Sequence, residues 1–209
     1  MFMRISLFVA VLVLAFGSTD VLSGENSEAS TSNVLKELVG PLSDKSGYMV
    51  LINHNTLAIK GMAVDPSAYL HAVSGIPIFK NPQITGSAVR EGQSYEEQSF
   101  GLTAEIAGRP PNEGHGTANQ SGNASDVSSA VKTIFGKRSC TLVSELEIPE
   151  KGAKFRWRCP TNLLGVANIV LELETALNGI WVEDFAVFES SFLKENQKSM
   201  DIRFEAIAR

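Results

Sequence analysis

The chain contains only two cysteines, Cys140 and Cys159, and each lies at the end of a run in which apolar and polar residues alternate. Successive side chains of a β-strand point to opposite faces, so this alternation predicts two half-buried strands. The residues between the runs, Pro-Glu-Lys-Gly at 149–152, favour a turn because Pro presets φ and Gly tolerates positive φ. The segment therefore predicts a β-hairpin closed by a disulfide bond.

The alternation also predicts which side chains share a face of this hairpin. One face carries the two cysteines and most of the apolar residues, and we call it the first face. The other, second face places Glu145 and Glu147 against Lys154 and Arg156, and opposite charges across strands contribute roughly 0.2–1 kcal/mol per pair. Pairing Glu145 with Arg156 sets the two cysteines diagonally, whereas a two-residue slip sets them directly opposite. Both registers remain open and both keep the sulfur atoms on the first face, which carries Cys140, Leu142, Leu146, Ile148, Phe155, Trp157 and Cys159.

Residues 1–23 have the pattern of a secretory signal peptide. Arg4 supplies a positive charge, residues 5–16 are mostly apolar, and small residues follow, so we expect cleavage after Gly17 or Ser23. The apolar run is about a dozen residues, shorter than the roughly 20 that span a bilayer, although an uncleaved anchor is the alternative. We therefore expect an exported protein, periplasmic or secreted, in a compartment where disulfides persist.

Length and charge limit the remaining classes of protein. The 209 residues are enough for one domain or for two small ones that share a core. The net charge of −5 argues against nucleic acid or an anionic membrane surface as the main partner, because both need a basic surface. With only two cysteines, a hydrophobic core must supply most of the stability.

Four segments are predicted after the signal peptide. A polar, flexible leader covers 24–33, and a long loop of low hydrophobicity covers 108–124. Between them, residues 34–107 form an N-terminal α+β part with a helix capped by Ser32, a hairpin over 48–62, a helix that starts at Asp65-Pro66, and a strand over 99–107. Residues 125–209 form the C-terminal part.

The C-terminal part is predicted to be one helix followed by antiparallel strands. Ser125 or Asp126 caps the helix, which carries an apolar stripe at helical spacing and ends at Gly136. Strands are predicted over 166–174, 180–188 and 200–207, in addition to the hairpin. The predicted fold class is therefore α+β, with a helix packed on a C-terminal antiparallel β-meander and a smaller N-terminal helix–hairpin–helix part.

Candidate catalytic residues are few. Glu172, Glu174, Glu183 and Asp184 are predicted to lie on adjacent strands, where they could hold Ca²⁺ or act as an acid and base, or could be neutralised by Arg156, Arg158 and Arg203. His115 lies in the long loop beside a carboxylate, Glu113. The sequence contains no GxSxG, P-loop, GxGxxG, HExxH or CxxC motif, so we expect no cofactor and no metal.

These observations favour an exported, non-enzymatic protein that binds another protein or assembles on the cell envelope, with open strand edges and the 108–124 loop as contact surfaces. The alternatives are an exported hydrolase that uses His115 with Glu183 or Asp184, and a domain that binds a small ligand between helix and sheet. Asn119 and Asn123 lie in glycosylation sequons, which have meaning only in a eukaryotic host.

Overall fold

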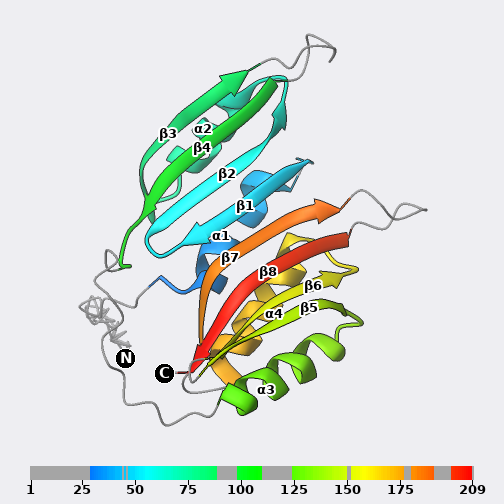
Figure 1. Ribbon diagram of the computed structural model, residues 1–209. Helices are drawn as coiled ribbons and strands as arrows, with labels where there is room; N and C mark the ends of the chain where they lie inside the picture. Colours follow the sequence, from blue (N-terminus) through cyan, green and yellow to red (C-terminus); the bar gives the residue numbers. More distant parts are fainter. Residues whose placement is uncertain are drawn as a thin grey trace, which may run out of the picture.

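The structure is a computed structural model that describes residues 29–43, 45, 47–88, 98–109, 124–149, 152–176, 180–190 and 199–208. These residues form one eight-stranded antiparallel sheet, in the order β3-β4-β2-β1-β7-β8-β6-β5, with four helices on one of its faces (Figure 1). The elements are α1 (Thr31–Leu42), β1 (Tyr48–Asn53), β2 (Thr56–Ala63), α2 (Pro66–Ser74), β3 (Phe79–Ala88), β4 (Gln98–Ile106), α3 (Ala124–Gly136), β5 (Thr141–Ile148), β6 (Gly152–Cys159), α4 (Leu163–Ala176), β7 (Ile180–Ser190) and β8 (Ser199–Ala208).

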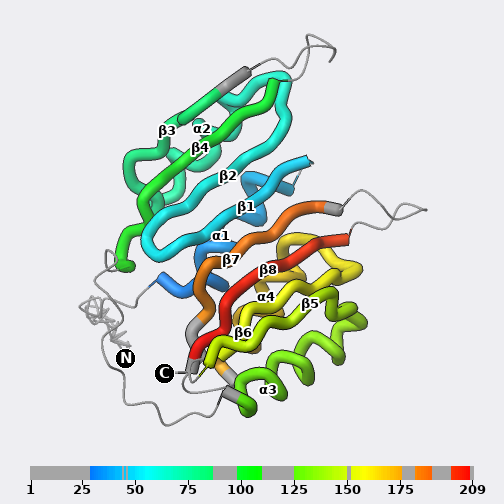
Figure 2. The backbone as a smooth tube through the Cα atoms, in the orientation of Figure 1, coloured from blue at the N-terminus to red at the C-terminus, as the bar shows by residue number. Residues whose placement is uncertain are grey.

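The chain is built from two halves with the same order of elements. Each half runs helix, two strands, helix, two strands, and its four strands lie in the same spatial order, β3-β4-β2-β1 in one half and β7-β8-β6-β5 in the other. The halves join where β1 pairs with β7 and α1 packs on α4 (Figure 2). One hydrophobic core therefore runs through both halves, between the helices and one face of the sheet.

The hydrophobic core is built from alternate residues of the strands. At the junction, Val50 lies opposite Val187 and Ile52 opposite Phe185, and all four side chains are buried on the helical face. In the C-terminal half, the fully buried Phe135 of α3 stacks on Trp157 and Phe204, with ring centroids 4.8 and 5.5 Å away. The apolar stripe predicted for the helix that begins near Ser125 therefore faces the core.

The predicted disulfide is confirmed, with Cys140 and Cys159 joined at an S–S distance of 2.06 Å and a Cα–Cα distance of 4.2 Å. Thr141 lies opposite Arg158 and Leu142 opposite Trp157, which is the register that sets the cysteines opposite one another. A β-bulge at Val143 then shifts the register by one residue.

Beyond this bulge, the predicted faces of the first hairpin strand are wrong. Glu145 lies opposite the buried Phe155 and so faces the helices, where it pairs with Lys132 of α3 at 2.7 Å. Leu146 lies opposite Lys154 on the other face and is 66 % exposed. A shift of one residue moves every following side chain to the opposite face, which is why the predicted Glu–Arg and Glu–Lys pairs do not form.

The strand predicted over 166–174 is also wrong, because these residues belong to helix α4. Asn162 begins this helix by accepting a hydrogen bond from the backbone of Gly165 at 2.9 Å. With a helix between β6 and β7, β6 pairs with β8 instead of β7, so the C-terminal strands do not form a simple meander. The α+β class itself is confirmed.

The N-terminal half contains more than a helix–hairpin–helix unit, because β3 and β4 follow α2 and complete a four-stranded sheet. Its first helix begins at Thr31 with Ser30 as the cap, two residues before the predicted cap Ser32. Its second helix begins as predicted, with Asp65 accepting a hydrogen bond from the backbone of Ser67 at 2.9 Å. The predicted signal peptide, and residues 110–123 of the predicted loop, lie outside the described residues.

Candidate functional site

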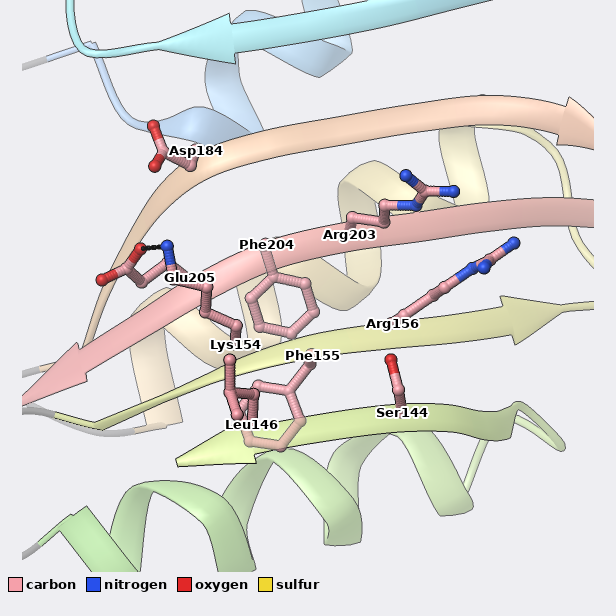
Figure 3. Close-up of a pocket in the computed structure, with 9 residues that line it drawn as sticks. All are labelled: Ser144, Leu146, Lys154, Phe155, Arg156, Asp184, Arg203, Phe204 and Glu205. Atoms are coloured by element: carbon pink, nitrogen blue, oxygen red, sulfur yellow. Dashed lines mark ion pairs between the residues drawn. The ribbon is translucent and has the colours of Figure 1, made fainter. Parts of the chain in front are cut away.

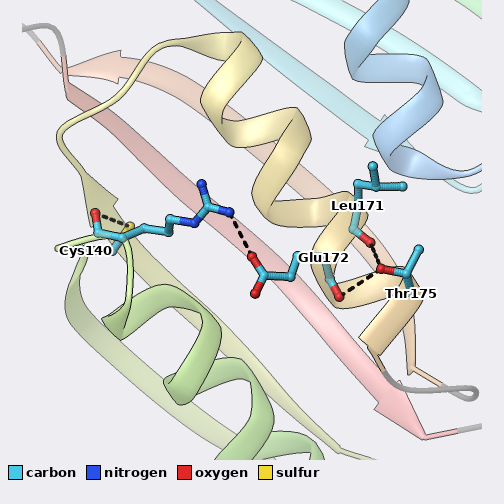
Figure 4. Close-up of polar contacts among 5 residues, drawn as sticks. Cys140, Leu171, Glu172 and Thr175 are labelled. Carbon is cyan, nitrogen blue, oxygen red and sulfur yellow. Dashed lines mark hydrogen bonds and ion pairs between the residues drawn. The ribbon is translucent and has the colours of Figure 1, made fainter.

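The structure separates the four carboxylates that were predicted to lie together. Glu172 and Glu174 lie on α4, where Glu172 pairs with Arg138 at 2.9 Å (Figure 4) and Glu174 accepts a hydrogen bond from the backbone of Thr31 at the start of α1. Glu183 and Asp184 lie on β7 instead. The predicted cluster of four is therefore wrong, and within the described ranges no group of three or more potential ligands could hold a metal ion.

His115, the one histidine among the candidate catalytic residues, lies outside the described residues, so the structure does not test its predicted partnership with Glu183 or Asp184. The remaining candidates occupy the face of the sheet opposite the four helices, which we call the open face (Figure 1). Directly opposed residues of antiparallel strands share a face, so the register of β6, β8 and β7 defines three rows of side chains across it. The rows are Arg158–Asp201–Phe188, Arg156–Arg203–Ala186 and Lys154–Glu205–Glu183.

Asp201 is the buried centre of the first row. Its side chain is only 3 % exposed, and its two carboxylate oxygens accept hydrogen bonds from Arg156 and Arg158, each at 3.0 Å. Burial by itself raises the pKa of Asp201, but the hydrogen bonds and charges of Arg158 and Arg156 outweigh burial and hold this pKa below its usual range. Asp201 is therefore ionised at neutral pH.

A third arginine, Arg203, lies directly opposite Arg156. Its guanidinium lies over the ring of Phe188, 5.2 Å from the centroid, and no described carboxylate forms an ion pair with it. We call Arg156, Arg158 and Arg203 the arginine cluster. The cluster thus holds three guanidinium groups and one buried carboxylate, which pairs with only two of them. This leaves a surplus of positive charge at this end of the open face.

The arginine cluster also contains an unsatisfied donor. Arg156 Nε is buried and has no hydrogen-bond partner among the described residues. An unpaired buried donor costs about 1–3 kcal/mol, and like charges directly opposite each other on a sheet are unfavourable. The arrangement of Arg156 and Arg203 is therefore not explained by stability alone.

Acidic side chains gather about one row further along the strands. Glu183 lies opposite Glu205, and a β-bulge between Glu183 and Ala186 inserts Asp184, whose φ of 44° is in the left-handed region. The bulge keeps Phe185 buried while Asp184 lines the same surface as Glu205. Lys154 pairs with Glu205 at 2.8 Å and is the basic residue of this row. We call Glu183, Asp184 and Glu205 the acidic cluster.

A shallow pocket of about 400 Å³ lies between the two clusters (Figure 3). Arg156 and Arg203 lie side by side at one end, and Asp184 lies at the other end on β7, beside the pair formed by Lys154 and Glu205 (Figure 3). Ser144 and Leu146 of β5 form one side of the pocket. The pocket is therefore polarised, with positive charge at one end and negative charge at the other.

The edge strand β5 is a second candidate site. It is paired with β6 along one side only, and most of its side chains are exposed, including Leu142, Val143 and Leu146 at 36, 44 and 66 %. The opposite edge strand, β3, contains Pro82, which has no N–H to donate, and two register shifts against β4. Of the two sheet edges, β5 is therefore the one whose backbone is open to another strand.

Sequence reasoning found the arginines of the open face but not their partner. Asp201 is the first acidic residue of the alternating run 200–207, and this alternation could have placed it on the same face as Arg203. The pocket itself depends on the bulges at Val143 and Asp184, for which the alternation gave no signal.

Comparison with known proteins adds no relative: no protein-family model, no curated protein and no solved structure matches this chain. Among the helices that the structure describes, none combines the length and apolar character needed to cross a membrane.

Proposed function

We propose that this chain is an exported, non-enzymatic protein that binds another protein by strand addition along β5. The observation that carries the proposal is the open backbone edge of β5, with exposed apolar side chains beside it. A strand that is paired on one side only can accept an extended segment of another chain, which gains main-chain hydrogen bonds. The junction between β1 and β7 is the same kind of antiparallel pairing within the chain.

The charges of β5 indicate which segment fits. A two-fold pairing of two copies centred on Leu146 would set Glu145 of one copy opposite Glu147 of the other, and like charges directly opposite are destabilising. Glu145 is already paired with Lys132, whereas Glu147 is exposed on the same helical side and Leu146 is exposed on the open side. The fitting segment therefore places a basic residue beside Glu147 and apolar residues on the open side. The partner is therefore a different protein with an extended basic and apolar segment.

Strand addition is tested with the peptide acetyl-Val-Lys-Val-Lys-Val-Lys-Val-amide. We expect measurable binding by fluorescence anisotropy, about tenfold weaker binding to the Glu147→Lys variant, and restored binding when that variant meets the peptide with Glu in place of Lys. Lys80→Glu on the opposite edge strand β3 is the matched control and leaves binding unchanged.

A peptide with methylated amides along its hydrogen-bonding edge keeps the same side chains but loses its donors. Strand addition requires that this peptide bind much more weakly than the unmodified one. Equal binding of the two peptides, or no binding of either, rules out β5 as the site.

Export is supported by the signal-like segment 1–23 and by the disulfide between Cys140 and Cys159. We expect the full chain, expressed with a C-terminal tag, to be recovered outside the cytosol with its N-terminus after Gly17 or Ser23. Intact-mass measurement and N-terminal sequencing check this result. Recovery of the unprocessed chain from the cytosol with reduced cysteines contradicts it.

A further inference from the structure

The pocket on the open face, which is distinct from the β5 backbone edge, carries a separate inference. We propose that it binds a small zwitterionic ligand of the size of a short peptide, with the ligand's carboxylate on Arg156 and Arg203 and its ammonium group on Asp184. The volume of about 400 Å³ lies in the range of small-molecule sites in proteins. The inference does not depend on strand addition at β5.

The carboxylate end follows from the arginine cluster. Arg156 and Arg203 lie directly opposite each other, and both line the pocket. Asp201 already accepts hydrogen bonds from Arg156 and Arg158, so the single buried carboxylate balances only part of the positive charge. A guanidinium group matches a carboxylate with two parallel hydrogen bonds, and a ligand carboxylate between Arg156 and Arg203 supplies the missing negative charge.

The ammonium end follows from the bulge in β7. Without an inserted residue, Glu183 and Asp184 would point to opposite faces of the sheet, but the bulge lets Asp184 line the pocket on the open face. Asp184 adopts this position at a φ of 44°, a region that Asp tolerates better than most residues. Among the described residues, Lys154 is the one basic residue that lines the pocket at this end, and it pairs with Glu205. A ligand ammonium group would therefore be placed on Asp184.

The pairing of β6, β8 and β7 also distinguishes this site from an ordinary charged surface. Opposite charges stabilise a sheet when they lie across from each other, as Lys154 and Glu205 do here. In the same rows, however, Arg203 lies opposite Arg156 and Glu183 lies opposite Glu205. The Arg203 guanidinium is directed to Phe188 rather than to the acidic cluster. Like charges are thus gathered at two ends whose Cα rows, at Arg203 and Glu205, are about 7 Å apart, the rise of two strand residues. The guanidinium groups extend further from the acidic end, because Arg156 reaches Asp201 and Arg203 lies over Phe188. A dipolar ligand that spans this longer distance neutralises both ends at once.

The test uses tri-alanine with free ends, tri-alanine acetylated at its N-terminus, and tri-alanine amidated at its C-terminus, each titrated into the full chain by calorimetry. We expect the free peptide to bind at least about tenfold more tightly than either blocked form. In Arg203→Gln, the free and amidated peptides bind equally weakly. In Asp184→Asn, the free and acetylated peptides bind equally weakly.

Lys60→Gln, on the open face outside the pocket, is the matched control and leaves all three affinities unchanged. The comparison of blocked and free peptides on the unmodified protein needs no variant, so a misfolded variant does not obscure the result. Equal affinity for the three peptides, or no heat of binding for the free one, overturns the proposal. A simple anion site would show two results together: inorganic phosphate competes fully with the free peptide, and the acetylated peptide binds as tightly as the free one. That combination also overturns the proposal.

Discussion

Replacing Asp201 with alanine is expected to lower the free energy of unfolding by about 3 kcal/mol, because it leaves two arginines without their shared buried carboxylate. Asp201 is 3 % exposed on its side chain, whereas Arg156 and Arg158 are 34 % and 43 % exposed. Water can reach the two arginines, so the expected loss lies at the low end of the range for a broken buried pair. Urea unfolding followed by circular dichroism measures this loss.

Two further variants separate charge from shape. Asp201→Asn keeps the shape and one acceptor, and we expect it to cost about 2 kcal/mol because hydrogen bonds to a charged group are lost. Glu205→Gln, on the same strand as Asp201, removes the ion pair with Lys154, whose side chain is 54 % exposed. We expect this variant to lower the free energy of unfolding by less than about 1 kcal/mol. Equal losses for the alanine variant of Asp201 and for Glu205→Gln contradict the special role of Asp201.

The same residue gives the stability a dependence on pH. The pKa of Asp201 is lower in the folded protein than in the unfolded chain, where it is about 4, so the unfolded chain binds more protons between these two values. The stabilisation from Asp201 is therefore fully present above about pH 4 and is lost as the pH falls through the lowered pKa. Asp201→Asn lacks this contribution, so its stability falls less steeply over the same acidic range.

Removing the disulfide is the second change with a large expected effect. The bond closes a loop with a sequence separation of 19 residues, and the chain-entropy relation gives about 3 kcal/mol for a loop of this size. We expect the Cys140→Ala, Cys159→Ala double variant to have a free energy of unfolding about 3 kcal/mol lower and a Tm about 10 °C lower than the unmodified protein.

A reducing agent provides the control for this experiment. Dithiothreitol should destabilise the unmodified protein by a similar amount and leave the double variant unchanged. If the double variant unfolds within about 1 kcal/mol of the oxidised protein, the disulfide contributes little and the remaining contacts of β5 and β6 hold the hairpin.

Local patterns correctly predicted the hairpin of β5 and β6 and its disulfide, because both depend on residues close together in the chain. The two cysteines bracket the turn at Pro149, and the alternation on β6 from Ala153 to Cys159 is unbroken. On β5, however, one extra residue at Val143 moves every following side chain to the opposite face of the sheet, and no Gly or Pro in the sequence at this point indicates a bulge. Contacts of Glu145 with Ser128 and Lys132 of α3 accompany this reversed face.

Helix α4 shows a different reason for failure. Its sequence from Val166 to Glu174 is rich in β-branched and apolar residues and is typical of a buried strand, but it forms a helix that packs against α1, α3 and β7. Burial on more than one side favours apolar residues all around a helix, which weakens the period that distinguishes it from a strand. The cap at Asn162 and the buried positions Leu163, Val166, Ala167, Val170 and Leu173 carried the helical signal.

The seam between β1 and β7 also determines when the fold can be completed. A chain made from its N-terminus has finished α1 and β1 long before β7 is synthesised, and until then the backbone of β1 is unpaired on that side. Strand pairings between distant parts of a chain form slowly, and the partly folded chain is prone to aggregation until they form. For a polypeptide that is translocated before it folds, this delay is harmless; for one that stays where it is made, protection of the growing chain becomes necessary.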